Sequence, residues 1–409
     1  MFKKFWRSEQ GNYAVATAIA MVPLMAGVGG AVDFAVATRE GANLQNALDT
    51  AALAIGSKYV AGMTEAEYQA IGYNYFQANL RLLVNPTTTV DHENGQTSAR
   101  TGGFDASVSG TGASYMVRAS ASISYPGLIG ALAWPLTRSA TATISSGDPA
   151  CLLALNQHAS QALEFKGNTD VAVEGCVIAS NSDASDSISR GGSAKLSAKC
   201  AVAVGGISGL ADSSTKLACP GPMPGQFPSF DPLSGIVPPP YGSCLSAKGQ
   251  TMQPGTYCNK TISGTVTLEP GTYVFKGGKI NLGGNGSLSG AGVTIFLMDG
   301  AQLSMNANQS VNLSPPDSGP YSGIVIYQAR DNTAGMTING GSNSSISGFV
   351  YAPGARVTYN GNSTTASTAC LRIVADTIKM NGNSKVKSDC NKELGGRTMY
   401  SGRYLTLVR

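Results

Sequence analysis

The chain has 409 residues and a formal net charge of +4 at pH 7, and only 13% of its residues are charged. Lysines and arginines form no dense run, so nucleic acid is excluded as an expected partner. The low charge and the 42% hydrophobic content also exclude a disordered chain, and the 51 glycines favour many short strands joined by tight turns.

The first predicted element is an apolar helix over Tyr13–Val32, twenty residues without a charge. A helix of this length spans roughly 30 Å, the thickness of a bilayer's hydrocarbon core. Lys3, Lys4 and Arg7 precede it, so the positive-inside rule keeps the N-terminus cytoplasmic and sends the rest outward. A cleaved signal peptide is the alternative, but too little apolar chain precedes the cleavage-like site at 18–20. We therefore expect an uncleaved membrane anchor.

The helix is expected to continue beyond the membrane as an amphipathic stalk. Asp33 follows the apolar run, and we expect its carboxylate to reach interfacial water. Apolar side chains then recur at helical spacing and form a stripe that needs a partner, either the chain's own domain or another subunit. The stripe consists of Leu44, Ala47, Leu48, Ala51, Ala52, Ile55 and Tyr59.

Residues 11–56 resemble the N-terminal segment of the TadE/TadG-like proteins of Flp (Tad) pilus assembly. Gly11 opens the apolar run, Asp33 closes it, and the stretch LQNALDTAALA follows with Leu44, Gln45 and Asp49. The resemblance implies a non-enzymatic component of a bacterial pilus system, anchored in the inner membrane, with its bulk in the periplasm or at the cell surface. It also implies other pilus-assembly or pilin-like proteins as partners.

One position departs from the pattern of pilin-like precursors. In those precursors prepilin peptidase cuts after a glycine, and a glutamate stands five residues beyond the cut. Five residues beyond Gly11 this chain has Ala16. We therefore expect neither processing at Gly11 nor a role as the major pilin.

Residues 61–149 predict a small α+β domain. Thr64 and Glu67 have the spacing of a capping box, and the apolar pattern after them predicts a helix to about Leu83. From Phe104 the period changes to that of strands, at about 104–109, 114–125 and 136–145. The apolar insert at 126–135 is expected to pack in the core rather than to touch a membrane or a partner.

A pattern of alternating apolar residues followed by Gly or Ala and by Asn recurs between residues 150 and 390. VTYNGNS begins at Val357 and IKMNGNS at Ile378, a step of 378 − 357 = 21 residues. A longer step separates the copies at Leu303 and Met336, so one repeat is expected to carry an inserted loop. Further copies begin at Leu163 and Ile280, and a second apolar series begins at Gly292, Gly323, Gly348 and Leu371.

One such unit cannot bury its apolar face alone, whereas stacked units of near-fixed length can. The repeat therefore predicts a right-handed parallel β-helix in which asparagines at equivalent bends form hydrogen-bonded ladders. A β-sandwich of antiparallel hairpins is the structural alternative. The whole chain is then mainly β, with a membrane and stalk helix (1–60), the α+β domain (61–149), the β-helix (150–390) and a C-terminal cap over the last coil (391–409).

The eight cysteines all lie in the predicted β-helix and include no CxxC pair, which predicts disulfides formed in an oxidising compartment. Residues one coil apart lie roughly 5 Å apart, so we expect the pairs Cys151–Cys176 and Cys370–Cys390. The proline-rich run between Cys219 and Cys258 is expected to project from the stack as a loop stapled by cysteines. The full set of candidates is Cys151, Cys176, Cys200, Cys219, Cys244, Cys258, Cys370 and Cys390.

The sequence offers little material for catalysis. With only two histidines we expect no catalytic residue, no metal and no cofactor. The alternative function is a membrane-tethered β-helix enzyme that acts on polysaccharides, or a polysaccharide-binding adhesin, and it depends on fold analogy alone. It requires carboxylates gathered on one coil face. The candidates share no register with the repeat, namely Asp170, Glu174, Asp183, Asp299 and Asp376.

Overall fold

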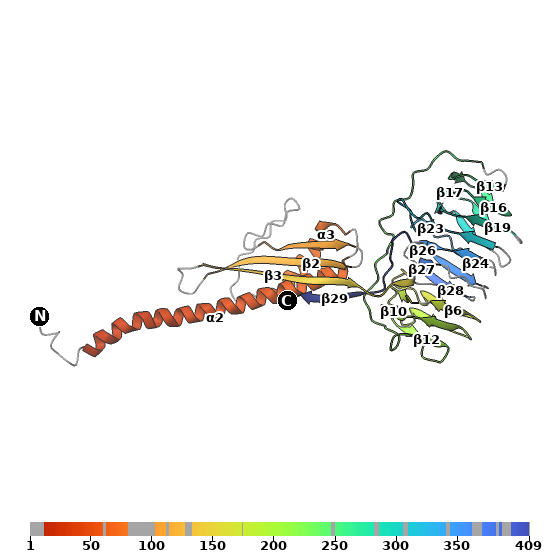
Figure 1. The fold of residues 1–409 in the computed structure, drawn as a ribbon. Helices are drawn as coiled ribbons and strands as arrows, with labels where there is room; N and C mark the ends of the chain where they lie inside the picture. Colours follow the sequence, from red (N-terminus) through yellow and green to blue (C-terminus); the bar gives the residue numbers. More distant parts are fainter. Residues whose placement is uncertain are drawn as a thin grey trace. The chain divides into compact units, whose positions relative to one another are not determined.

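A computed structural model gives the fold of the chain (Figure 1). It describes residues 12–59, 63–80, 103–111, 114–126, 133–173, 175–246, 250–281, 286–305, 310–340, 344–361, 370–381, 384–386 and 394–408. The chain is mainly β with a long N-terminal helix, as predicted. It divides into two compact units, one within residues 1–144 and 405–409 and the other within 145–404.

Two helices belong to the described part of the first unit. The first, α2 (Asn12–Lys58), is a single helix that continues through Pro23. The second, α3 (Glu65–Asn79), begins at the predicted capping box, where the Thr64 amide donates to Glu67 Oε2 at 2.8 Å and the Glu67 amide donates to Thr64 Oγ1 at 3.4 Å. The helix ends at Asn79 and not at Leu83, because Leu80 has already left the helical backbone region.

The sheet of the first unit has four strands in the order β1 (Asp105–Thr111), β2 (Ser114–Pro126), β3 (Ala133–Ser146) and β29 (Arg403–Val408). α2 packs against β2, and α3 packs against β1. The apolar insert expected in the core falls largely on residues 127–132, outside the described residues. Small and β-branched side chains form the buried face of the sheet: Ala106, Val117, Ala119, Ala121, Ile123, Ala140, Ala142 and Ile144.

The C-terminal tail does not cover the last coil of the β-helix, so that prediction is wrong. Its strand β29 lies next to β3 at the edge of the four-stranded sheet. Leu405 of this strand packs against α2 so closely that a Cβ at Gly56 would lie 2.4 Å from its Cδ1 atom. The alternating apolar residues of the tail therefore complete the small domain.

The second unit is a parallel β-solenoid, which excludes the antiparallel sandwich. Every described strand pair within it is parallel. Its main row of strands has the order β10 (Ala201–Ala203), β7 (Val177–Ser180), β4 (Ala150–Ala154), β27 (Leu371–Met380), β26 (Gly348–Gly361), β23 (Ile324–Gln328), β20 (Val293–Met298), β17 (Gly271–Lys276) and β14 (Gly255–Cys258).

Two further rows of strands are described beside the main row. The second row consists of β11 (Ile207–Ser208), β8 (Ile188–Arg190), β5 (Leu163–Phe165), the ends of β27 and β26, β24 (Met336–Gly340), β21 (Gln302–Ser304), β18 (Lys279–Asn281) and β15 (Thr261–Ile262). The third row is described as two sheets. One consists of β12 (Thr215–Leu217), β9 (Lys195–Ala198), β6 (Asp170–Val173) and β28 (Ser384–Val386). The other consists of β25 (Ser345–Ile346), β22 (Ser310–Leu313), β19 (Ser287–Gly290), β16 (Thr265–Leu268) and β13 (Thr251–Met252).

The repeated motif of the sequence sets the register of the stack. Val357 is the Cα partner of Ile378, one repeat further along the chain, and the pairing continues through Tyr359 and Met380. Asparagines form a ladder, since Asn360 Nδ2 donates to Asn339 Oδ1 at 2.6 Å and Asn381 Nδ2 donates to Asn360 Oδ1 at 3.2 Å. These asparagines precede the glycine of the motif. Most of those predicted for the ladder lie outside the described residues: Asn285, Asn308, Asn343, Asn362 and Asn383.

The coils are not stacked in chain order. The solenoid consists of a first arm, residues 150–217, and a second arm, residues 251–386, and the last coil of the second arm pairs with the first coil of the first arm. Ile373 is the Cα partner of Leu152, and Ile378 is the partner of Leu163. Both arms advance in the same direction, so together they form one stack that begins at β14 and ends at β10.

Residues 218–250, called the strap below, connect the two arms. Met223 bridges to Val202 at the β10 end, and Cys244 bridges to Thr256 at the β14 end. Between these points Asp231 contacts Arg330, and Ile236 contacts Tyr327. The strap therefore lies along the stack. The prediction that it projects from the stack is wrong.

The strap lies on the outer side of the main row because that side is apolar. Large side chains there are fully or almost fully buried, among them Phe296, Tyr327 and Tyr351. Leu233 of the strap and Leu394 and Met399 of the C-terminal segment pack against them. Burying this much apolar surface stabilises the lateral position of the strap.

Candidate functional site

The first half of α2 has the features of a membrane-spanning helix. Its apolar side chains are exposed, with Val22 at 72% and Met25 at 73% of full exposure. Among the helices of the described residues, α2 is the one long and apolar enough to cross a bilayer. Apolar residues exposed in such numbers are stable next to lipid and costly next to water.

The second half of α2 is buried by the chain's own small domain. Every residue of the predicted apolar stripe, from Leu44 to Tyr59, is at most 9% exposed. α3 and β2 supply the packing surface, so the stripe is confirmed and its partner is the chain itself. The exposed large apolar side chains of α2 therefore lie in its N-terminal half.

The polar residues of the motif lie at the start of the buried half of α2 and within it. Gln45 Nε2 donates to Asp49 Oδ1 at 2.8 Å and to the Ser139 carbonyl in β3 at 3.2 Å, which fixes the helix to the sheet. Asp33 is only 6% exposed, so the expectation that it reaches interfacial water is wrong. The buried stripe begins at Asp33 and continues with Ala37 and Glu40 at helical spacing. Gly11 lies outside the described residues.

Within the described residues, three disulfides link neighbouring coils or fasten the strap. Cys151 is joined to Cys176 in the next coil, with 5.7 Å between the Cα atoms, as expected. Cys200–Cys219 and Cys244–Cys258 hold the two ends of the strap. Cys370 is also disulfide-bonded, but Cys390 lies outside the described residues, so the pair Cys370–Cys390 stays a prediction.

The chain enters and leaves the solenoid at one place, called the neck below. Its two segments, residues 147–150 and 399–402, run antiparallel and form a bridge between Pro149 and Tyr400. The Ala150 amide donates to the Met399 carbonyl at 2.7 Å, and the Ser401 amide donates to the Asp148 carbonyl at 2.9 Å. This two-segment attachment was not predicted, because nothing in either short segment indicates the other.

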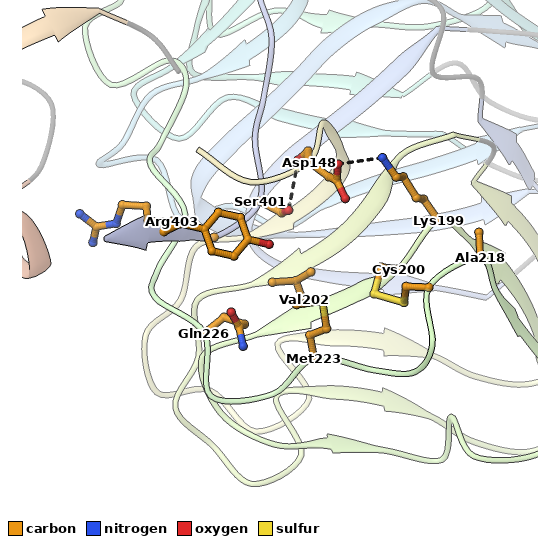
Figure 2. Close-up of a pocket in the computed structure, with 12 residues that line it drawn as sticks. Asp148, Lys199, Cys200, Val202, Ala218, Met223, Gln226, Ser401 and Arg403 are labelled. Atoms are coloured by element: carbon orange, nitrogen blue, oxygen red, sulfur yellow. Dashed lines mark hydrogen bonds and ion pairs between the residues drawn. A yellow bond between two sulfur atoms is a disulfide. The ribbon is translucent and has the colours of Figure 1, made fainter. Parts of the chain in front are cut away.

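A small cavity lies beside the neck (Figure 2). Lys199 Nζ donates to Asp148 Oδ1 at 2.7 Å at its edge, and the Cys200–Cys219 disulfide and Met223 form an apolar wall. Its volume is about 120 Å³, whereas pockets for cofactors and other small molecules usually measure about 300 to 1,000 Å³. The cavity is therefore too small for a cofactor-sized ligand.

An open groove follows the third row of strands across four coils of the second arm. Its volume is about 560 Å³. Thr267, Ser289, Asn312 and Ser345 occupy equivalent positions on successive coils and lie along it. Thr267 Oγ1 and Ser289 Oγ are 3.3 Å apart. The groove is uncharged and rich in hydroxyl groups.

The carboxylates that an enzyme would need are dispersed. Asp183 lies 3.0 Å from His158 Nδ1, Asp376 accepts a hydrogen bond from Asn156, and Asp299 accepts one from Tyr241. Asp170 lies in β6, and Glu174 is outside the described residues. No group of three or more His, Cys, Asp or Glu that could hold a metal occurs within the described part of the chain.

Comparison with known families bears on both units. Residues 11–56 match the family model of putative Flp pilus-assembly TadE/G-like proteins. The N-terminal helix is a TadE/G-like segment. Residues 241–394 match a second family, described as a domain of unknown function (DUF7305). Comparison with curated proteins and with solved structures gave no match.

The TadE/G-like segment covers both halves of α2. It includes the exposed apolar half, the buried stripe down to Gly56, and the polar residues Asp33, Gln45 and Asp49. The resemblance inferred from the sequence is thereby confirmed. The DUF7305 match contains the second arm of the solenoid and excludes the first arm.

Proposed function

We propose that this chain is an inner-membrane-anchored, non-enzymatic component of the Flp/Tad pilus assembly system, either minor pilin-like or pilus-associated. Its N-terminus lies in the cytoplasm, and the small domain and solenoid lie in the periplasm or at the cell surface. Pilin-like or other pilus-assembly proteins contact the exposed half of α2 within the membrane.

The observation that carries the proposal is the division of one TadE/G-like helix into two environments. Its first half exposes apolar side chains, and its second half is sealed by the chain's own domain. A helix built in this way places a folded domain directly against a membrane. The basic residues at the N-terminus support the proposed orientation.

Deletion of the gene in the producing bacterium, with plasmid-borne rescue, tests the assignment. We expect fewer pili in electron micrographs and weaker surface adhesion, and recovery with the full chain. The chain with Val22→Arg and Met25→Arg should not restore pili, because two charges in the exposed half oppose membrane insertion. The chain with Val22→Leu and Met25→Leu is the matched control and should restore them. Unchanged pilus number and adhesion after deletion would contradict the assignment.

A polysaccharide-binding role is the second candidate, and the hydroxyl-lined groove favours it. Neutral sugar polymers are recognised by hydrogen bonds, and Thr267, Ser289 and Asn312 offer such groups at regular intervals. The test is retention of the purified full chain on columns of neutral and of acidic envelope polysaccharide. Retention that Asn312→Leu abolishes and that the variant Ser213→Leu, outside the groove, preserves would support this role.

A further inference from the structure

Most of the exposed large apolar side chains in the described part of the second unit belong to the strap. Within the described part of residues 145–404, the large apolar side chains classed as exposed are Phe227, Val237, Tyr241, Leu245 and Tyr404, and the first four belong to the strap. Val237 is 78% exposed, more than any other large apolar side chain described. Scattered exposed apolar residues are ordinary, but a cluster on one segment is typical of an interaction surface.

The sequence around Val237 fixes an extended backbone. Pro238, Pro239 and Pro240 follow it, and proline locks its own φ near −65° while restricting the preceding residue to extended conformations. These constraints favour a polyproline II conformation, which has three residues per turn and no internal hydrogen bonds. We call residues 236–241 the proline ridge.

Burial along the proline ridge follows this three-residue period from Ile236 to Pro240. Val237 and Pro240 are exposed, whereas Ile236, Pro238 and Pro239 are half-buried. Tyr241, at the end of the ridge, is exposed and departs from the period. Ile236 packs on the outer apolar face of the main row. One side of the segment therefore lies on the coils, and the opposite side presents Val237 and Pro240 to the surroundings.

The N-terminal part of the proline ridge is held by tyrosines of the solenoid. Tyr321 Oη donates to the Val237 carbonyl at 3.1 Å, and Tyr327 Oη donates to the Ile236 carbonyl at 3.4 Å. Because the prolines have no N–H group, these carbonyl contacts replace the ladder hydrogen bonds of a strand.

The C-terminal part is held by charged and polar groups of the coils. Tyr241 Oη donates to Asp299 Oδ1 at 3.0 Å, and Lys276 Nζ lies 4.5 Å from the centre of the Tyr241 ring. The Gly242 amide donates to Thr256 Oγ1 at 2.8 Å, and the Cys244–Cys258 disulfide follows. The ridge is thus ordered before any partner binds, so binding loses little conformational entropy.

We propose that the proline ridge docks into an aromatic-lined groove on a partner protein. Grooves of this kind recognise polyproline II segments by packing aromatic rings against proline and adjacent apolar side chains. The exposed side of the ridge offers apolar rings and the Val237 side chain, and two of its carbonyls are already occupied by tyrosines. It therefore offers little to the hydroxyl groups of a sugar.

The main aromatic row of the solenoid does not receive the ridge of a second copy. This row, formed by Phe296, Tyr327 and Tyr351, is already buried under the strap. Tyr257 and Tyr273 lie in the interior of the solenoid. We therefore take a different protein as the occupant, and an adduct with a second copy alone counts against the proposal.

Site-specific crosslinking of the full chain in the producing bacterium tests the proposal. A benzophenone amino acid replaces Val237, or in the matched control Ser213, which is exposed on another turn of the same unit. We expect a discrete adduct with one other protein from position 237 and none from position 213. The readout is the crosslinked protein itself and does not depend on pilus formation.

Affinity measurements with the crosslinked partner, purified, then test the mode of binding. We expect Val237→Asp to weaken binding to the full chain at least tenfold and Ser213→Asp to change it less than twofold. Since the Val237 side chain is so exposed, both variants should keep the far-UV circular dichroism of the parent chain. Absence of an adduct, equal adducts from both positions, an adduct only with a second copy, or an affinity unchanged by Val237→Asp would each overturn the proposal.

Discussion

Ile373, in the last solenoid coil to be synthesised, pairs in parallel with Leu152 in the first coil. Both side chains are fully buried. Around this seam the Leu155 amide donates to the Ala375 carbonyl at 2.8 Å, and Asn156 Nδ2 donates to Asp376 Oδ1 at 2.8 Å. The two arms therefore share one apolar interior and one hydrogen-bonded ladder.

Ile373→Ala is expected to destabilise both arms together. Removing three carbons from a fully buried site in a well-packed core costs about 2 to 5 kcal/mol, whereas Ile373→Val costs about 0.5 to 1.5 kcal/mol. The measurement is guanidinium unfolding of the full chain in detergent, followed by circular dichroism and by hydrogen exchange in each arm. Two separate transitions, one for each arm, would show that the seam does not couple them.

Asp231→Asn is expected to loosen the strap. Asp231 Oδ2 accepts hydrogen bonds from Arg330 at 2.5 Å and from Tyr351 Oη at 2.8 Å. Burial and the Asp231 charge raise the pKa of Tyr351 far above its ordinary value. Burial alone would lower the pKa of Arg330, but its hydrogen bond and charge interaction with Asp231 help to raise it.

Loss of the Asp231 charge should cost about 1 to 3 kcal/mol of unfolding free energy, toward the lower end because Arg330 is half exposed. The control is Asp148→Asn, which breaks the exposed pair with Lys199 and should cost less than about 1 kcal/mol. Hydrogen exchange in residues 231–241 should rise only in the Asp231 variant. Equal effects of the two substitutions would contradict the assigned role of Asp231.

Gly147→Ala is expected to disrupt the neck. A Cβ at this position would lie 2.0 Å from the Ser401 carbonyl oxygen, so the two neck segments must separate. Forced overpacking of this kind costs about 1 to 3 kcal/mol. Gly221→Ala is a matched control, because a Cβ there meets no atom within 4 Å, and it should change stability by less than about 0.5 kcal/mol. Thermal unfolding of the two variants side by side gives the comparison.

The capping box of α3 should make stability depend on pH in the acid range. Hydrogen bonds from the Thr64 amide and hydroxyl lower the pKa of Glu67 below its ordinary 4.5. A carboxylate whose pKa is lower in the folded state contributes stability above about pH 4.5, and the contribution is lost as the pH falls through the folded-state pKa.

Glu67→Gln should remove this dependence, because the amide keeps the shape of the cap without titrating. The difference in unfolding midpoint between the parent chain and Glu67→Gln should be present at pH 7 and shrink as the pH falls below about 4.5. Glu65→Gln, in the same helical turn but outside the capping box, serves as the control. A difference that persists unchanged at pH 3 would count against the carboxylate as its cause.

Local patterns predicted the elements of the solenoid well. Val357 and Ile378 have the same residue pattern because they occupy equivalent places in neighbouring coils, and the structure pairs them. The apolar stripe of α2 from Leu44 to Ile55 follows the same logic, since a buried helix face has a fixed period.

The order of the coils could not be predicted, because equivalent strands carry equivalent patterns. Leu163 is as suitable a neighbour for Ile378 as any other residue of its row, and only the completed stack selects that pairing. The prediction that the strap projects from the stack was wrong for a related reason. Its prolines indicate a loop, but whether a loop projects or lies flat depends on the surface beneath it, here Phe296 and Tyr351.

The seam between the two arms also determines when the protein can finish folding. The ribosome makes Leu152 long before Ile373, so the first coils leave it with one apolar end uncovered until the final coil arrives. Until then, the exposed apolar end of the first coils can aggregate or bind a chaperone. A truncation just before β27 would leave that end uncovered permanently.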